Sequence, residues 1–319
     1  MIIEKWKNAQ TYVIGKYHIS NNMVCQDRTY SMDYNGVKVI ALADGAGSQP
    51  QSEIGAELVC KKICDILSEH FNEYLLMFEY EKTNLSKHNK KMELLKKDII
   101  SKLSSALKNK AIELDVPVKC LGSTLLFFAI KDNFYIMGHI GDGVIAGLFN
   151  ENNRPNIKVI SKPENGAASN ITFFVTDSDS SEHLRLSAGK LENLTGVIMT
   201  SDGAGDILFN SNGVDKSTYE LFSKFYNKTN GEYETMLARF LSEVIANYST
   251  DDLSLNLLLL EDISTDSLSD DYLKYLFDDI TSSRQIIRKS QYCYYLDPSV
   301  SGEYEFENPD DVKRYLGWN

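Results

Sequence analysis

Short apolar runs divide the first part of the chain into predicted strands. The segment 11–19 (TYVIGKYHI) and the two halves of 28–44 (RTYSMDYNGVKVIALAD) have the composition that is typical of strands. Asn35-Gly36 lies between the two halves, and this dipeptide favours a two-residue hairpin turn. We therefore expect one N-terminal strand followed by a β-hairpin that ends at Asp44.

Two longer segments have the three-to-four-residue apolar spacing of amphipathic helices. The first begins at Ser52, whose hydroxyl is expected to cap it, and the second covers about 91–114. A further helix is predicted over about 232–248. In the second helix the positions expected to share one apolar stripe are Leu94, Leu95, Ile99, Leu103, Leu107 and Ile112.

The remaining apolar runs predict six more strands. They lie at 123–130, 133–140, 144–149, 171–176, 196–202 and 253–260. Asp132-Asn133 and Asp142-Gly143 are expected as tight turns that join the first three of these strands into hairpins. Because hairpin neighbours pair antiparallel, the pattern predicts an α+β protein with mostly antiparallel sheets and helices packed outside them.

Composition and charge limit the classes of partner. The chain has 319 residues, a net charge of −12 and a pI of about 5.0, which disfavours nucleic acid or an anionic membrane as partner. Its five cysteines are scattered and complete no zinc set, which indicates packing thiols in a reducing compartment. No run approaches the ~20 apolar residues of a membrane helix, and the N-terminus lacks a signal-peptide core. We expect a cytoplasmic protein.

Carboxylates recur at the ends of separate apolar strands. They are Asp27, Asp44, Asp142, Asp202 and Asp251. Converging carboxylates raise one another's pKa unless a cation compensates, and oxygen ligands without a His/Cys set suit Mg²⁺ or Mn²⁺. Two such ions that share a carboxylate can lower the pKa of a water and aim it at a phosphorus centre. Each Asp-Gly pair taken alone is also ordinary turn chemistry.

Seven segments, in this order, resemble the motifs of the PPM/PP2C family of metal-dependent serine/threonine protein phosphatases. They are HISNNMVCQDR (18–28), ALADGAGS (41–48), LGSTLLFFAI (121–130), GHIGDG (138–143), PENG…NITFF (163–174), IMTSDGAGDIL (198–208) and DDLSLNLLLL (251–260). The chain looks closest to the bacterial branch whose first acidic motif reads Cys-Gln-Asp. The resemblance implies an αββα sandwich, two mostly antiparallel β-sheets face to face with helices outside, and a dimetal site at one end.

The resemblance also implies roles for individual residues. Asp44 would bridge two metals, the Gly45 carbonyl would bind one of them, and Asp202 and Asp251 would hold the other. Asp142, together with Asp202, would bind a third and more weakly held metal. Catalysis would therefore depend on Asp44, Asp202 and Asp251.

Asp27 would contact the metal-bound water network or a metal directly. Three other positions in the motifs differ from the residues that relatives carry there. Gln26 stands where many relatives have a glutamate that ligates the second metal. Ala46 stands where some carry a histidine, a proposed general acid for the leaving group. The arginine that some relatives use to hold the substrate phosphate falls near Asn22.

Other polar residues near the motifs are expected to support the site. His18 and His139 are interpreted as structural histidines with satisfied hydrogen bonds, and Ser123 and Thr124 as hydrogen-bonding residues near the centre. Asp252 is expected to act as a local cap or ion-pair partner. A region over 161–190 would form the flap that shapes substrate access.

The implied activity is hydrolysis of phosphoserine or phosphothreonine in proteins by a dimetal-bound water, with Mn²⁺ or Mg²⁺ as cofactor. A phosphorylated protein substrate and a partner Ser/Thr kinase follow from the family analogy alone. Two alternatives stay open, a pseudophosphatase that acts as a partner-binding module and a phosphohydrolase of small phosphoesters or nucleotides. The phosphatase domain is expected over 1–261. The segment 262–319 would be either a partner-binding appendage or an extension packed on the domain surface.

Overall fold

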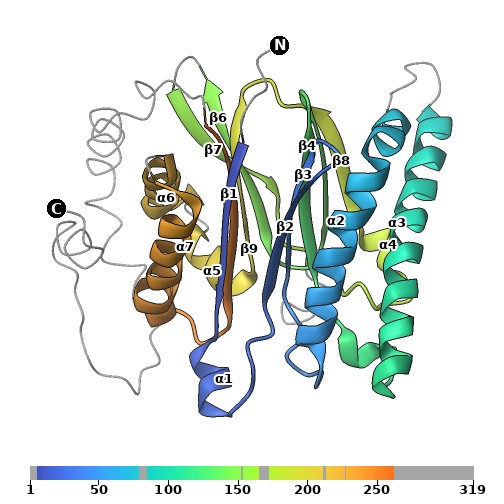
Figure 1. Ribbon diagram of the computed structural model, residues 1–319, viewed down its shortest axis with the longest axis horizontal. Helices are drawn as coiled ribbons and strands as arrows, with labels where there is room; N and C mark the ends of the chain where they lie inside the picture. Colours follow the sequence, from blue (N-terminus) through green and yellow to red (C-terminus); the bar gives the residue numbers. More distant parts are fainter. Residues whose placement is uncertain are drawn as a thin grey trace. The chain divides into compact units, whose positions relative to one another are not determined.

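Two five-stranded antiparallel sheets face each other in the computed structural model (Figure 1). The structure describes residues 6–78, 85–151, 154–164, 172–210, 213–226 and 228–261, all of them within one compact unit of the chain. The first sheet has the order β1 (Trp6–Val13), β12 (Leu253–Leu260), β9 (Leu194–Thr200), β6 (Val144–Glu151) and β7 (Arg154–Ser161). The second has the order β2 (Arg28–Tyr34), β3 (Val37–Ala43), β4 (Leu125–Lys131), β5 (Phe134–Ile140) and β8 (Arg185–Lys190). The predicted extension over 262–319 lies outside the described residues.

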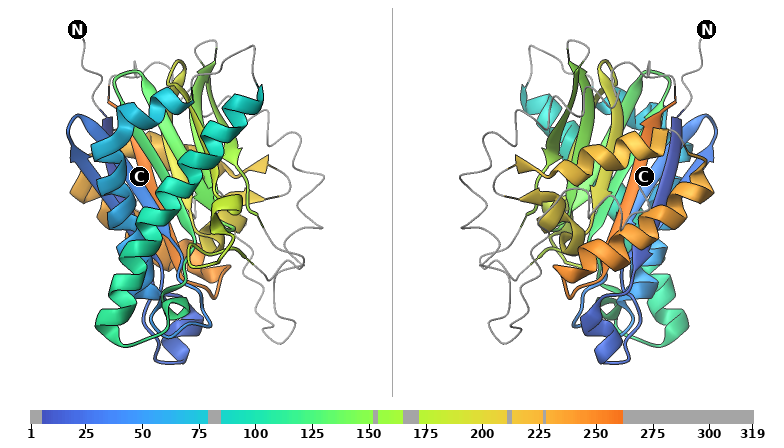
Figure 2. Two further views of the ribbon diagram at one scale, coloured as in Figure 1. Left: turned by 90° about the vertical axis from the view of Figure 1, so that its right-hand side faces the viewer. Right: turned by 90° about the vertical axis from the view of Figure 1, so that its left-hand side faces the viewer.

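Pairs of helices cover the outer faces of the two sheets (Figure 2). The helices α2 (Ser52–Met77) and α3 (Leu85–Leu114) pack on the second sheet, and α6 (Lys216–Tyr226) and α7 (Asn230–Arg239) pack on the first. The short elements are α1 (Lys16–Ser20), α4 (Ser180–His183), α5 (Asp202–Leu208), a 3₁₀ turn at Val118–Leu121 and the ribbon β10 (Phe209–Asn210) with β11 (Gly213–Val214). This α+β sandwich confirms the predicted fold class. Among the described helices, none combines the length and the apolar character that crossing a bilayer requires.

Alternation along β3 shows how the strands build two apolar layers. Val39 and Ala41 are buried with residues of α2, whereas Ile40 and Leu42 are buried with Leu258 of β12 between the sheets. Successive side chains of a strand point to opposite faces, so a strand that is apolar throughout can fill both layers. The hairpin before it forms as predicted, and Asn35 and Gly36 take the positive φ angles, 55° and 71°, that such a two-residue turn requires.

The stripe predicted for the second helix is partly confirmed. Its buried members are Leu95, Ile99, Leu103 and Leu107. Leu94 and Ile112 are instead 54% and 78% exposed, and that part of the prediction was wrong. At 3.6 residues per turn the buried face continues through Ala111, and the side chain of Ile112 points away from it.

Two predictions near helix starts also need correction. The segment 11–19 is not one strand, because β1 ends at Val13 and Lys16–Ser20 forms α1. Ser52 is the first residue of α2 and does not cap it, and its hydroxyl donates to the carbonyl of Gln49 at 3.3 Å. The helix predicted over about 232–248 forms as α7, which continues as a π turn and a 3₁₀ turn to Asn247.

The predicted Asp142-Gly143 hairpin does not exist. β5 belongs to the second sheet and β6 to the first, so residues 141–143 carry the chain from one sheet to the other. Gly141 has a φ of +107°, and a Cβ on Gly143 would lie 2.6 Å from the Thr200 carbonyl oxygen. Each strand finds a partner that is distant in sequence, β8 for β5 and β9 for β6, and local turn chemistry carries no information about such pairing.

The predicted strand at 171–176 was also wrong over its described part, where residue 172 forms only an isolated bridge and residues 175 and 176 lie in a turn. The carboxylate of Asp177 accepts the backbone N–H of Phe174 at 2.7 Å. Such a side chain offers the backbone a local alternative to a sheet ladder.

We expect Asn256→Ala to destabilise the sandwich because Asn256, fully buried in β12, connects the two sheets. Its side-chain nitrogen donates to the carbonyls of Tyr30 and Ala41, which belong to β2 and β3. Loss of these bonds is expected to lower the free energy of unfolding by about 1–3 kcal/mol. Urea unfolding measures this, with the exposed Asn247→Ala as control. A buried variant that shifts the midpoint no more than the control would contradict the role.

Candidate metal centre

Three of the predicted carboxylates meet at one end of the sandwich. One oxygen each of Asp44, Asp142 and Asp202 lies within 4.8 Å of the others. Asp44 follows β3 of the second sheet, Asp202 follows β9 of the first and begins α5, and Asp142 lies in the crossing between the sheets. The acidic centre, as we call these three residues together with Asp27 and Asp251, therefore draws on both sheets.

Asp27 and Asp251 lie beside these three carboxylates and differ in their exposure to solvent. Asp27 is only 1% exposed, whereas Asp251 is an exposed residue just before β12. The charges of both raise the pKa values of Asp44 and Asp202, so all five carboxylates share one electrostatic environment. That Asp27 and Asp251 also ligate a metal stays a prediction.

The backbone at Asp44 is held by the neighbouring strand. Its N–H donates to the Thr124 hydroxyl at 2.9 Å, and its carbonyl accepts the Thr124 N–H at 2.8 Å. Gly45 bridges to Ser123, and a Cβ there would lie 2.8 Å from the Ser52 hydroxyl oxygen. Thr124 supports the centre as predicted, whereas the buried hydroxyl of Ser123, predicted to do the same, has no hydrogen-bond partner among the described residues. A Cβ on Gly45 would also lie 2.9 Å from the Gln26 carbonyl oxygen, which is a close backbone approach that favours glycine.

Asp202 is held equally closely against the chain at Asp251. Its carboxylate accepts the N–H of Gly203 at 2.7 Å. A Cβ on Gly203 would lie 2.4 Å from the Asp252 carbonyl oxygen, so the start of α5 and the start of β12 are in direct backbone contact.

Burial and mutual repulsion raise the pKa values of these carboxyls. Burial is the largest cause for Asp44, whose pKa lies well above the usual range, and four neighbouring carboxylates raise it further. Burial, then the charges of Asp142 and Asp251, raise the pKa of Asp202 to about 7. The pKa of Asp27 also rises to about 7, chiefly through burial, and the charge of Asp252 adds to the rise.

The donor set of the centre fits a hard divalent cation. Both carboxylate oxygens of Asp27, one of Asp142 and the amide oxygen of Gln26 are buried and have no hydrogen-bond partner among the described residues. Buried polar atoms are normally paired, and unpaired acidic oxygens that repel one another are the groups a cation would satisfy. Because every donor is an oxygen, the set suits Mg²⁺ or Mn²⁺ better than Zn²⁺.

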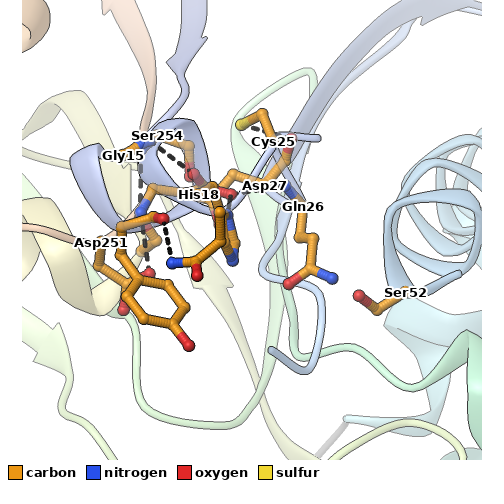
Figure 3. A network of polar contacts seen from close by, with 12 residues as sticks. Gly15, His18, Cys25, Gln26, Asp27, Ser52, Asp251 and Ser254 are labelled. Atoms are coloured by element: carbon orange, nitrogen blue, oxygen red, sulfur yellow. Dashed lines mark hydrogen bonds and ion pairs between the residues drawn. The ribbon is translucent and has the colours of Figure 1, made fainter. Parts of the chain in front are cut away.

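One residue that organises this region was underestimated from the sequence. Asp252 is 2% exposed, and its carboxylate accepts the N–H groups of Gly15 and Gln26, at 2.7 and 2.5 Å, and contacts Nδ1 of His18 at 2.8 Å. Figure 3 shows His18 and Asp27 near the middle of this network, with the side chain of Gln26 pointing toward Ser52. The sequence predicts a local cap or ion-pair partner, and Asp252 does pair with His18. Its partners lie more than two hundred positions away, however, where no local signal marks them.

The prediction of structural histidines with satisfied hydrogen bonds holds for His18, whereas Nε2 of the buried His139 has no hydrogen-bond partner among the described residues. His18 is bound to Asp252, and Nδ1 of His139 lies 2.8 Å from the Ser161 hydroxyl. Burial, followed by the charge of Arg185, lowers the pKa of His139 well below its usual value, which keeps the ring neutral.

The described part of the predicted flap is anchored beside Asp142. The N–H of Glu164 and the guanidinium of Arg185 both donate to the Gly141 carbonyl, at 3.0 and 3.2 Å, and the two side chains form an ion pair. The ring of His183 stacks on Phe173 with the centroids 3.4 Å apart.

Comparison with known proteins agrees with this geometry. A family model described as protein phosphatase 2C matches residues 14–242. The chain belongs to the protein phosphatase 2C family. No curated protein matches it.

Solved phosphatase structures share the PP2C fold with this chain at low sequence identity. A bacterial serine phosphatase is 15% identical, with a TM-score of 0.55 over 82% of this chain and all of the other. The serine/threonine phosphatase of S. agalactiae is 17% identical, with a TM-score of 0.52 over 81% of this chain and all of the other. Stp1 from Staphylococcus aureus is 15% identical, with a TM-score of 0.53 over 81% of this chain and 96% of the other.

The positions that differ from many PP2C relatives are well ordered by local contacts. The side-chain nitrogen of Gln26 donates to the Gln49 carbonyl at 3.2 Å, and Ala46 is buried. Arg28 donates to the carbonyls of Cys25 and Asp27, at 2.6 and 2.7 Å, so it braces the Asp27 loop.

In metal-free protein we expect Asp202→Asn to be more stable than the wild type, by a margin that grows with pH. The pKa of Asp202 is about 7 in the folded state, above the ordinary 3.8. The folded state therefore binds more protons between these values, and the favourable contribution of the neutral carboxyl is lost as the pH rises through about 7. Above that pH the variant should gain at least about 1 kcal/mol.

Thermal unfolding in EDTA at pH 4.5 and pH 8 measures this margin. Saturating Mn²⁺ should reverse the order if Asp202 is a ligand as predicted, because only the wild type then keeps the full set of carboxylates. A margin that does not change with pH would contradict the repulsion argument.

Proposed function

We propose that this PP2C-family protein is a divalent-metal-dependent protein serine/threonine phosphatase. The observation that carries the proposal is the convergence of Asp44, Asp142 and Asp202 within 4.8 Å, together with the buried and unpaired carboxylate of Asp27. Carboxylates are expensive to bury together unless a cation binds among them. Membership of the family supports phosphoester hydrolysis as the reaction that this cation would serve.

Each residue of the centre has a distinct part in this proposal. Asp44 would contribute to two cation positions, with the carbonyl of Gly45 at one of them and Asp202 and Asp251 at the other. Asp142 would serve a third and weaker position, and Asp27 would accept hydrogen bonds from water or contact a cation. When bound, Mn²⁺ or Mg²⁺ would acidify water and neutralise charge on the phosphoryl group.

Protonation of the leaving serine or threonine oxygen is assigned to solvent. Ala46 has no proton to give, and the two histidines nearest the motifs are not available to a substrate. His18 is buried against Asp252, and His139 is 1% exposed with its Nδ1 at the Ser161 hydroxyl. Asp251 is the exposed member of the centre, so we place substrate entry on its side.

The proposed substrate is a phosphorylated protein in a pathway with a partner Ser/Thr kinase. Family analogy supports this choice, and the motifs themselves handle only the phosphoryl group. We also propose a cytosolic location, because the four cysteines in the described part of the chain are free thiols. The domain boundary is proposed at residue 261, where the described chain ends after β12.

Two alternative functions stay open, a pseudophosphatase and a phosphohydrolase of small phosphoesters. Gln26 and Ala46 replace a ligand and a proton donor of many relatives, which favours a pseudophosphatase that binds a partner through 262–319. The motifs themselves handle only the phosphoryl group, which keeps small phosphoesters as the other alternative. The same assay separates all three functions.

The first test is hydrolysis of a phosphothreonine peptide by the full chain, with Mn²⁺ titrated in and EDTA as control. We expect metal-dependent phosphate release, and we expect Asp202→Asn to lower kcat/KM by about 100-fold or more. Asp98→Asn is the matched control, since Asp98 contacts Tyr74 and Lys102 on the outer helices. Folded protein that binds Mn²⁺ but releases no phosphate from the peptide would overturn the proposal. Turnover of nucleotides alone would support the small-phosphoester alternative.

A further inference from the structure

We propose that Asp252 and His18 are positioning residues, which hold the chain at Gln26–Asp27 against the chain at Asp251 so that the acidic centre can bind its cation. This inference rests on the proposed function for the statement that a cation binds there. Neither residue is expected to touch the cation or the substrate.

The contacts of Asp252 reach the N-terminal part of the chain. One carboxylate oxygen accepts the N–H of Gly15 at 2.7 Å, and the other accepts the N–H of Gln26 at 2.5 Å and contacts Nδ1 of His18 at 2.8 Å. An ionised carboxylate is an acceptor only, so Nδ1 of His18 carries the hydrogen. The buried side chains of Asp252 and His18 thus link two segments that lie 226 to 237 positions apart in the sequence.

A predicted ligand is adjacent to each end of this connection. Asp27 follows Gln26, and Asp251 precedes Asp252, whose N–H donates to the Asp251 carboxylate at 2.8 Å. The same carboxylate of Asp252 therefore sets how far apart Asp27 and Asp251 can lie. Gly15 permits the close fit, because a Cβ there would lie 2.2 Å from the Asp251 carbonyl carbon.

A purely stabilising role explains Asp252 poorly. Burying a carboxylate costs desolvation even when it is paired, and an apolar residue at the start of β12 would avoid that cost. The charge of Asp252 also raises the pKa values of Asp27 and Asp251, which opposes the ionised state of the centre. Geometry is the benefit that remains, because three donors from one distant segment converge on one carboxylate.

The outer partners of metal ligands commonly set ligand orientation, and their loss weakens metal binding 10–100-fold. His18→Leu removes the donor and leaves the side chain of Asp252 unchanged, so it tests the contact that positions the two segments. His18→Asn places an amide N–H close to where Nδ1 was and should rescue the contact. Asp252→Asn turns one acceptor oxygen into an NH₂ group, which leaves one of the backbone N–H groups unpaired.

The experiment measures the Mn²⁺ affinity of the metal-depleted full chain, by electron paramagnetic resonance of free Mn²⁺, beside kcat and KM for the phosphothreonine peptide. His18→Leu and Asp252→Asn should weaken Mn²⁺ binding by about tenfold. His18→Asn should stay within about threefold of wild type, and KM for the peptide should not change. His70→Leu and Asp98→Asn are the controls, since His70 pairs with Glu73 on the outside of α2 and Asp98 lies on α3.

The outcomes separate this inference from the proposed function. Folded His18→Leu and Asp252→Asn proteins with wild-type Mn²⁺ affinity would overturn the inference and leave the phosphatase standing. Mn²⁺ affinities in the expected order without peptide hydrolysis would overturn the phosphatase and support the inference. A wild-type chain that binds no Mn²⁺ at millimolar concentration would overturn both. Should Asp252→Asn fail to fold, the comparison of His18→Leu with His18→Asn decides alone, because Asp252 then keeps both backbone donors.

Discussion

Repulsion among half-buried carboxylates is the constraint on which the rest of this structure depends. Asp44, Asp142 and Asp202 bring one oxygen each within 4.8 Å, and burial raises the pKa values of all three. Such a cluster opposes folding unless protons or cations compensate. The two apolar layers of the sandwich must therefore hold the carboxylates together. The free energy of packing in these layers offsets the repulsion between the acids.

The sandwich holds these acids in place because each of them lies next to the end of a strand. Asp44 leaves β3 in the second sheet, and Asp202 leaves β9 in the first. Contacts with other segments then fix the backbone just after each strand. Thr124 hydrogen-bonds to the backbone at Asp44, and Gly203 packs on the chain at Asp252. Because the contributing strands belong to opposing sheets, the distance between the acids is set by the packing of the layer between those sheets.

Glycine residues make this convergence sterically feasible. Gly15, Gly45 and Gly203 each lie where a Cβ would come within 2.8 Å of another part of the chain. Each of these positions lies against a segment that carries or adjoins one of the acids, and a side chain there would push the two segments apart. The cost in conformational entropy is accepted where the close approach is needed.

Local patterns were sufficient to identify the elements that are decided by neighbours in sequence. The hairpin at Asn35-Gly36, the strand at 253–260, most of the buried stripe of α3 and the acids at strand ends could all be recognised, because alternation, turn chemistry and residue type are local properties. Only the tertiary structure decided that β5 and β6 belong to different sheets, and that Asp252 connects to Gly15, His18 and Gln26. Those outcomes depend on partners far away along the chain, where the free energy of pairing and burial is settled by three-dimensional packing and leaves no periodic trace in the sequence.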